Sequence, residues 1–468
     1  MVCADKGEKP PSRMNKPVDQ TGHTYTGWGK RMSWLDHEMA AKWRQEGKRY
    51  AADVNEFVRI GMESQWQQEQ PEPKQDERSK LAEDIFRMIQ DANQAEETEQ
   101  LRREIPAASW PLTAAFEEAL QAVRPIAFMN GGNEVILHAG NPRECGMIYV
   151  AGKDRILQIP GLHRVGCSPD GTYFALVDGQ GIRIVRQPDL NLQGEETAHF
   201  QWKDIQGRLK ASIPDLECLG DEEHPEDILD EVIPFGDGQR VLLVCGYGVY
   251  LLAGDQVDLI HPKTSERREL ELEDTIVDMA HGAVSRDGRW IAYGSQMSEH
   301  MLMDLSDKTV HTLEPNSSYP HYAVFSKDDL NVWYNACHFY NGATIQVSIA
   351  EVDQGLAQNK EEWPMINEEM RVYAATALTQ GSILGDAYGY LRLIDREGRE
   401  LWRYFVGSTI SGLAVTPDEG MLAVGTYGGM LHLIDLQSST KDEYSIGTAL
   451  IHETERWMIW RNYEPLRW

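Results

Sequence analysis

Two different patterns of apolar residues divide the chain near residue 124. From Met32 to about Ile60, apolar side chains recur at steps of three and four, the period of an amphipathic α-helix. A second stretch with this period begins at about Leu81, and Ser109 with Pro111 opens a third. Beyond residue 124 the apolar residues form short runs bounded by Gly, Asp and Asn, which is typical of β-strands. The pattern predicts a helical region followed by a mainly β domain.

The helical region is predicted to span residues 1–124, with a linker near 65–79 that is rich in Gln, Pro and charge. Ser33 and Asp36 form a weak capping box at the start of the first helix, and Gly47 leaves open whether this helix is one or two. Its aromatic residues either anchor the helices or form an exposed surface for a partner. These residues are Tyr25, Trp28, Trp34, Trp43, Tyr50, Phe57 and Trp66.

One short unit recurs seven times in the β part. Each copy is a strand, a tight turn and a second strand, and the copies begin at Ala127, Cys167, Pro234, Ala283, Val324, Ala377 and Val415. The turns contain Asp-Gly, Asn-Gly or a related pair, because Gly and Asn accept the positive φ that tight hairpins need. Each copy continues into a third strand and usually a fourth. Four short strands repeated at roughly 40 to 50 residues are typical of a propeller blade.

The sequence therefore predicts a seven-bladed β-propeller over residues 125–447. Insertions stretch the repeat around 205–231 and around 354–369. The copies resemble blades of the WD-repeat-like propeller superfamily, and Ser168-Pro-Asp-Gly171 and Leu433-Ile-Asp-Leu436 are the best matches. The Trp-Asp pair of true WD repeats is replaced by Met303-Asp304, Ile394-Asp395 and Ile434-Asp435. The resemblance implies a fold and says almost nothing about function.

Two C-terminal segments add to this picture. Leu393 to Trp402 resembles a quinoprotein repeat, which implies a docking tryptophan and a quinone, but only one copy has it and no export signal accompanies it. The segment 448–468 is too aromatic to hang free in water. We expect it to add a strand or to pack over the propeller, anchored by Trp457, Trp460 and Trp468, and an exposed interface is the alternative.

Charge separates the two regions further. The net charge is -29, and residues 1–124 hold 18 basic and 22 acidic side chains, so that region accounts for -4 and the rest for -25. An acidic surface repels phosphate backbones and favours basic partners, so we expect a protein partner and no nucleic acid. Solubility alone is the alternative explanation of the acidity. No apolar run has the length of a membrane span, and with no signal peptide the expected location is the cytosol.

No catalytic constellation, metal site or cofactor site is predicted. The six cysteines are scattered without a CxxC pair, and the phosphate-loop, metalloprotease and calcium-loop motifs do not occur. Gly407 to Gly412 resembles a nucleophile elbow, but its glycines are one residue too far apart. Cys337-His338 is the nearest approach to a metal site, and a core or hairpin role outweighs it. A pair of carboxylates facing each other in the propeller channel stays open as an enzyme alternative.

The candidate partner-binding residues lie in an acidic insertion and in the aromatic tail. They are Asp221, Glu222, Glu223, Glu226, Asp227, Asp230, Glu231, Trp457 and Trp460. The insertion is either a solvated loop or an acidic arm that docks a basic partner, since loops vary freely on a rigid scaffold. The leading hypothesis is a non-enzymatic protein-binding propeller, in its sharpest form an immunity-type inhibitor of a basic toxin. The alternatives are a scaffold or regulatory subunit, and a hydrolase or lyase with a channel site.

Overall fold

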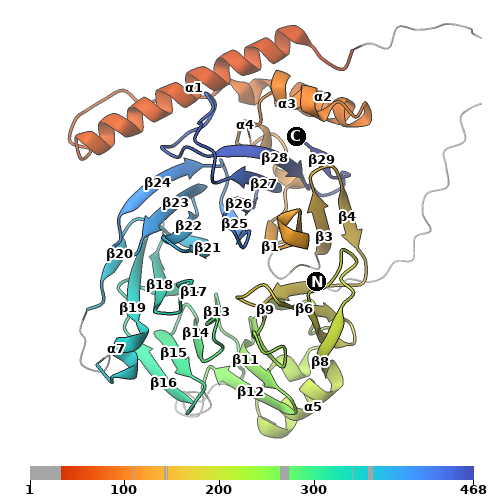
Figure 1. Cartoon of the computed structure of the whole chain (residues 1–468), viewed down its shortest axis with the longest axis vertical. Helices are drawn as coiled ribbons and strands as arrows, with labels where there is room; N and C mark the ends of the chain where they lie inside the picture. Colours follow the sequence, from red (N-terminus) through yellow and green to blue (C-terminus); the bar gives the residue numbers. More distant parts are fainter. Residues whose placement is uncertain are drawn as a thin grey trace, which may run out of the picture.

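The β part of the molecule is a closed ring of seven antiparallel sheets around a central channel (Figure 1). The computed structural model describes residues 33–468 except 109, 142–143, 145, 264–272, 340 and 357–361. Each sheet contains four strands in chain order, and the seventh has a fifth strand. The predicted seven-bladed β-propeller behind a helical N-terminal region is confirmed.

The strands follow the repeats found in the sequence. Blades one to four comprise β1 (Val123–Met129), β2 (Glu134–Ala139), β3 (Met147–Gly152), β4 (Ile156–Ile159); β5 (Arg164–Cys167), β6 (Tyr173–Asp178), β7 (Gly181–Arg186), β8 (Glu195–Gln201); β9 (Leu229–Pro234), β10 (Arg240–Cys245), β11 (Gly248–Ala253), β12 (Gln256–His261); and β13 (His281–Val284), β14 (Trp290–Gly294), β15 (His300–Asp304), β16 (Thr309–Leu313). Blades five to seven comprise β17 (Tyr319–Phe325), β18 (Asn331–His338), β19 (Asn341–Ser348), β20 (Met365–Asn367); β21 (Val372–Leu378), β22 (Gly381–Asp386), β23 (Tyr390–Asp395), β24 (Glu400–Phe405); and β25 (Ile410–Val415), β26 (Met421–Thr426), β27 (Met430–Asp435), β28 (His452–Met458), β29 (Leu466–Arg467).

All seven predicted turns connect the first strand of a blade to the second. In blade two, Gly171 has a φ of +76°, which an L side chain rarely adopts. Its N–H donates to the Ser168 carbonyl at 2.9 Å, and the Ser168 hydroxyl donates to Asp170 Oδ1 at 2.5 Å. The Ser-Pro-Asp-Gly pattern predicts the turn because Gly supplies the positive φ, and the Ser hydroxyl and the Asp carboxylate form a hydrogen bond within it.

Glycines on the first and second strands of the blades let neighbouring blades touch. A Cβ on Gly166 of β5 would lie 1.4 Å from the Val232 carbonyl oxygen on β9, and one on Gly425 would lie 1.7 Å from the Val123 carbonyl oxygen. Real Cβ atoms do not approach backbone this closely. Adjacent blades can therefore approach each other this closely only because these two positions have no side chain.

We expect Gly166→Ala to lower the free energy of unfolding by about 3 kcal/mol, because the new methyl group must push blade three outward. Urea denaturation followed by circular dichroism measures the change. The matched control is Gly207→Ala, which lies exposed in a helix with open space at its Cβ position. That variant should gain about 0.5 to 1 kcal/mol from helix propensity. Equal effects of the two substitutions would contradict the packing argument.

Blade seven closes the ring against blade one through side chains and not through a shared strand. Its fourth strand is β28, which lies in the segment predicted as a tail, so the blade ends beyond the expected boundary at residue 447. The Trp457 indole on β28 donates to the Gly152 carbonyl on β3 at 3.3 Å. Val135 and Leu137 of blade one pack with Leu431 of blade seven in the same apolar cluster.

The helical region contains α1 (His37–Glu63), η1 (Glu77–Leu81), α2 (Ala82–Gln94), α3 (Thr98–Glu104), α4 (Trp110–Thr113) and η2 (Glu117–Ala119). The prediction that Ser33 caps the first helix is wrong: Asp36 does, accepting hydrogen bonds from the Glu38 and Met39 amides at 3.0 Å. α1 is one helix through Gly47, which is buried because Arg78 and Tyr444 come within about 3 Å of its Cβ position. The third predicted helix is a single turn, α4.

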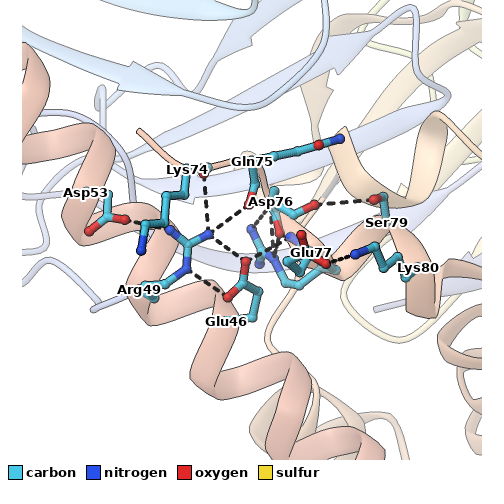
Figure 2. A network of polar contacts seen from close by, with 10 residues as sticks. Glu46, Arg49, Asp53, Lys74, Gln75, Asp76, Glu77, Ser79 and Lys80 are labelled. Atoms are coloured by element: carbon cyan, nitrogen blue, oxygen red, sulfur yellow. Dashed lines mark hydrogen bonds and ion pairs between the residues drawn. The ribbon is translucent and has the colours of Figure 1, made fainter. Parts of the chain in front are cut away.

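The predicted linker doubles back along α1 and is fastened to it by a polar network (Figure 2). Arg49 is paired with Glu46 and Asp53 on α1, and its Nη2 donates to the Gln75 carbonyl at 2.9 Å. Glu46 in turn accepts the amide of Glu77 at 2.8 Å. Hydrogen bonding to Arg49 lowers the pKa of Glu46 below its ordinary value, which keeps the carboxylate charged. The segment between α1 and α2 is therefore held in place.

The helices pack on blade seven and on the residues that come after it. Trp460 stacks on Phe86 of α2 with ring centroids 5.1 Å apart, and the Trp468 indole donates to the Ile105 carbonyl at 2.8 Å. The alternative of an exposed aromatic interface is wrong for Trp457 and Trp460. They are only 5% and 2% exposed, because Trp457 packs between blades one and seven and Trp460 packs in the core shared with the helices. β28 and β29 lie in the segment 448–468 and extend the sheet of blade seven.

Candidate protein-binding face and central channel

The order of strands gives the ring two faces that carry different sets of loops. Because successive strands of a blade are antiparallel, hairpins between second and third strands share one end with the connections between blades. We call this end the connection face. The opposite end, the turn face, carries the turns between first and second strands and those between third and fourth strands.

The turn face is tied together by contacts between blades. Asp329 accepts the amides of Arg286 and Asp287 from the preceding blade at 2.9 and 2.8 Å. Glu419 of blade seven forms an ion pair with Lys327 of blade five and accepts the Thr379 amide of blade six at 2.9 Å. These carboxylates are engaged in holding the ring together.

Neighbouring loops of the connection face also touch, so the face is continuous from blade three to blade seven. Backbone hydrogen bonds join Val277 to Gly246, Gln296 to Asp278, Ala387 to Arg371 and Tyr427 to Thr409, with lengths of 2.8 to 3.1 Å. The Arg371 guanidinium donates to the Phe339 carbonyl at 3.0 Å. Loops far apart in the sequence therefore form one surface of defined shape.

Four large apolar side chains project into solvent from these neighbouring loops. Ile276 is 58% exposed, Met297 84%, Phe339 67% and Tyr388 50%. They come from the connection that leads out of blade three and from the hairpins of blades four, five and six. Single exposed apolar residues are ordinary on a protein surface, but these four lie on loops of neighbouring blades at the same end of the ring.

The structure separates the predicted acidic arm into three parts. Asp221, at the end of η4 (Leu219–Asp221), and Glu223 are exposed on the connection face, and Glu222 beside them is partly exposed. Glu226 is only 7% exposed, so the prediction of a uniformly solvated loop or arm is wrong there. Asp227 is paired with His163 at 2.6 Å. The insertion is partly folded, since α5 (Trp202–Ser212) packs on blades two and three.

Asp230 and Glu231 belong to β9, the inner strand of blade three, and line the channel. The channel holds a cavity of about 660 Å³. Arg124 of blade one crosses it, donating to the Asp230 carbonyl at 3.0 Å and to the Ser411 carbonyl of blade seven at 3.3 Å. Its guanidinium lies 3.7 Å from Glu231 Oε1. Arg124 thus braces three blades, a role that sequence reasoning missed because the residue was placed at the end of the helical region.

Two groups that line the channel have pKa values raised by burial. Burial raises the pKa of Glu231 even though Arg124 opposes the shift, and burial raises the pKa of Tyr322 to about 12. The Tyr322 hydroxyl accepts the Ala375 amide at 3.1 Å.

Two buried histidines near the connection face have lowered pKa values. Burial lowers the pKa of His281 to about 4 and that of His321 to about 3. Cys337 is a free thiol whose pKa is raised by burial, and its neighbour His338 lies exposed beside Ser318. Within the described residues no three His, Cys, Asp or Glu side chains are grouped so that they could hold a metal ion.

Comparisons with known proteins identify no family for this chain. No family model matches the chain, and no curated protein matches it. Among solved structures it is similar to the β-propeller domain of Cps50 (Swd1) from Myceliophthora thermophila, with 11% identity and a TM-score of 0.44 over 65% of this chain and 93% of that one. None of the helices described is long and apolar enough to cross a membrane.

Proposed function

We propose that this chain is a non-enzymatic protein-binding propeller that recognises its partner through the connection face. The observation that carries the proposal is the exposure of Ile276, Met297, Phe339 and Tyr388 on adjoining loops of a braced ring. Large apolar and aromatic side chains are the residues that most often dominate binding energy at protein interfaces. A scaffold subunit and an immunity-type inhibitor are two forms of this function, and they differ only in what the partner does.

The test removes the apolar anchors and leaves the fold intact. Met297→Ser and Phe339→Ser are combined in one variant, and Leu330→Ser is the matched control, because Leu330 is 58% exposed on the turn face. Each protein is used to capture partners from the native cell extract, with quantitative mass spectrometry. We expect a partner retained by the wild type and the control to be lost at least about tenfold by the double variant, which corresponds to one moderate hot spot.

The same experiment can refute the proposed binding face. It can also distinguish a scaffold subunit from an immunity-type inhibitor. Equal recovery by all three proteins would place the binding elsewhere and refute the proposed face. If one protein is recovered in stoichiometric amount, its expression alone separates the two forms of the function. Toxicity that is relieved by co-expression of this chain supports an inhibitor, and a partner that brings further subunits supports a scaffold.

A further inference from the structure

The connection face is strongly asymmetric in charge. The segments 213–228, 273–280 and 295–299, which belong to the blade three and blade four side, contain eleven Asp or Glu and no Lys or Arg, while Lys263 lies in the same connection as 273–280. The exposed members are Asp215, Glu217, Asp221, Glu223, Glu273, Asp278 and Glu299. Clusters of acidic residues are common on solvated protein surfaces and do not by themselves indicate a binding site. This cluster is informative because it surrounds exposed apolar side chains.

The acidic residues flank exposed apolar side chains. Ile276 stands between Asp274 and Asp278 on one loop, and Met297 is two residues before Glu299 on the next. The two loops are joined by the Gln296 to Asp278 backbone hydrogen bond of 2.8 Å. Any molecule that covers these apolar side chains must therefore approach several carboxylates at the same time.

Basic side chains offset only part of this charge among the described residues. Asp221 has Lys210 at 3.4 Å, and Asp227 has His163 at 2.6 Å. Glu217 is bridged to Asp274 through the backbone, which holds two acidic loops together rather than apart. Like charges held close on a fixed surface raise the negative potential that a partner meets, and this potential extends about 8 Å at physiological salt.

We propose, as a refinement that rests on the proposed function, that the partner is a basic polypeptide segment with apolar anchors. Its Lys and Arg side chains cover the acidic loops of blades three and four, and its apolar side chains meet Ile276, Met297 and Phe339. Charge complementarity makes this the occupant that fits, because an acidic partner would be repelled and a nucleic acid would bring phosphates to the same carboxylates. The acidic loops do not extend past Phe339, because the guanidinium of Arg371, a basic residue, donates to the Phe339 carbonyl there.

The probe is a random 12-residue peptide library displayed on phage and selected on the folded full chain. We expect the enriched peptides to carry an excess of Lys and Arg together with apolar residues. One enriched peptide is then synthesised, and its Kd is measured by fluorescence anisotropy at low and high salt. The acidic variant combines Asp215→Lys, Glu223→Lys and Glu273→Lys, three exposed positions for which the structure shows no ion pair among its described residues.

The control variant makes the same change in net charge elsewhere. It combines Glu118→Lys, Glu195→Lys and Glu397→Lys, which are exposed on η2, on the outer strand β8 and on a turn of blade six. We expect the acidic variant to weaken binding by at least about tenfold and to lose most of the salt dependence, while the control changes Kd less than about threefold. Thermal melting confirms that all proteins are folded.

The outcomes separate the refinement from the proposed function. Peptides without a basic excess, or equal weakening in the two charge variants, would overturn the refinement. If such peptides still lose binding in the Met297→Ser and Phe339→Ser variant, the connection face remains the binding face. Peptides that bind equally well to every variant would refute both.

Discussion

Replacement of Trp468 by alanine is expected to lower the free energy of unfolding by about 3 to 5 kcal/mol. The indole is fully buried and lies 6.3 Å from the Trp43 ring of α1, centroid to centroid. Its N–H donates to the Ile105 carbonyl, and Arg456 lies over its face at 5.3 Å. The substitution removes all of these contacts at once and leaves a cavity between the helices and blade seven. Urea denaturation at 25 °C measures the loss.

The matched control for this substitution is Trp110→Ala. Trp110 belongs to the same helical region but is 58% exposed, so its replacement should cost less than about 1 kcal/mol. Hydrogen exchange adds a second readout, because amides of α3 should exchange faster only in the Trp468 variant. If both variants unfold at the same urea concentration, Trp468 does not hold the helices to the propeller.

The number of blades was predictable from sequence because each blade carries its own local signal. A turn such as Pro169-Asp170-Gly171 needs a positive φ at one residue, and the sequence records that need in a glycine. The alternation of short apolar runs with these turns then repeats seven times. Local backbone chemistry is visible in one dimension, which is why the fold class could be derived from it.

The site was less predictable because it depends on contacts between distant segments. Glu223 and Glu231 look alike in the sequence, yet one is exposed on the connection face and the other faces Arg124 in the channel. Only the position where β9 begins separates them. The ends of helices and strands are the least reliable part of a prediction from sequence pattern. The exposed apolar residues gave no signal either, since Met297 and Phe339 come after strands and resemble core positions until the hairpins are placed.

The braced ring and the exposed face are connected in physical terms. Arg124 across the channel and Glu419 on the turn face use their charges within the molecule, so these groups stabilise the ring and are not available to a partner. In the acidic loops of blades three and four, Asp215, Glu223 and Glu273 form no ion pair that the structure shows among its described residues. The apolar side chains among these loops remain exposed to solvent. A surface held in place before binding loses less conformational entropy when a partner docks.

Replacement of Glu453 by alanine is the second change with a large expected effect, a loss of about 3 to 5 kcal/mol. Glu453 is buried in β28 and accepts hydrogen bonds from Arg456 at 2.9 and 2.7 Å. It also accepts from His432 Nδ1 at 3.0 Å; burial and Arg456 lower the pKa of His432, so the neutral ring donates. Removing the carboxylate leaves the Arg456 guanidinium buried, 5% exposed, without its counter-charge. The control Glu38→Ala breaks an exposed ion pair with Lys42 and should cost less than about 0.5 kcal/mol.

The pH dependence of stability provides the decisive comparison for Glu453. Arg456, His432 and Arg102 hold the pKa of this carboxyl well below its ordinary value of 4.5, in spite of the desolvation that opposes them. A carboxyl with a depressed pKa in the folded state contributes its full stability above the unfolded pKa and loses it as the pH falls further. The wild type should therefore lose stability below about pH 4.5 more steeply than Glu453→Gln, which cannot ionise. Parallel curves for the two proteins would show that the buried ion pair does not stabilise the fold, and that the cost of Glu453→Ala comes from the cavity.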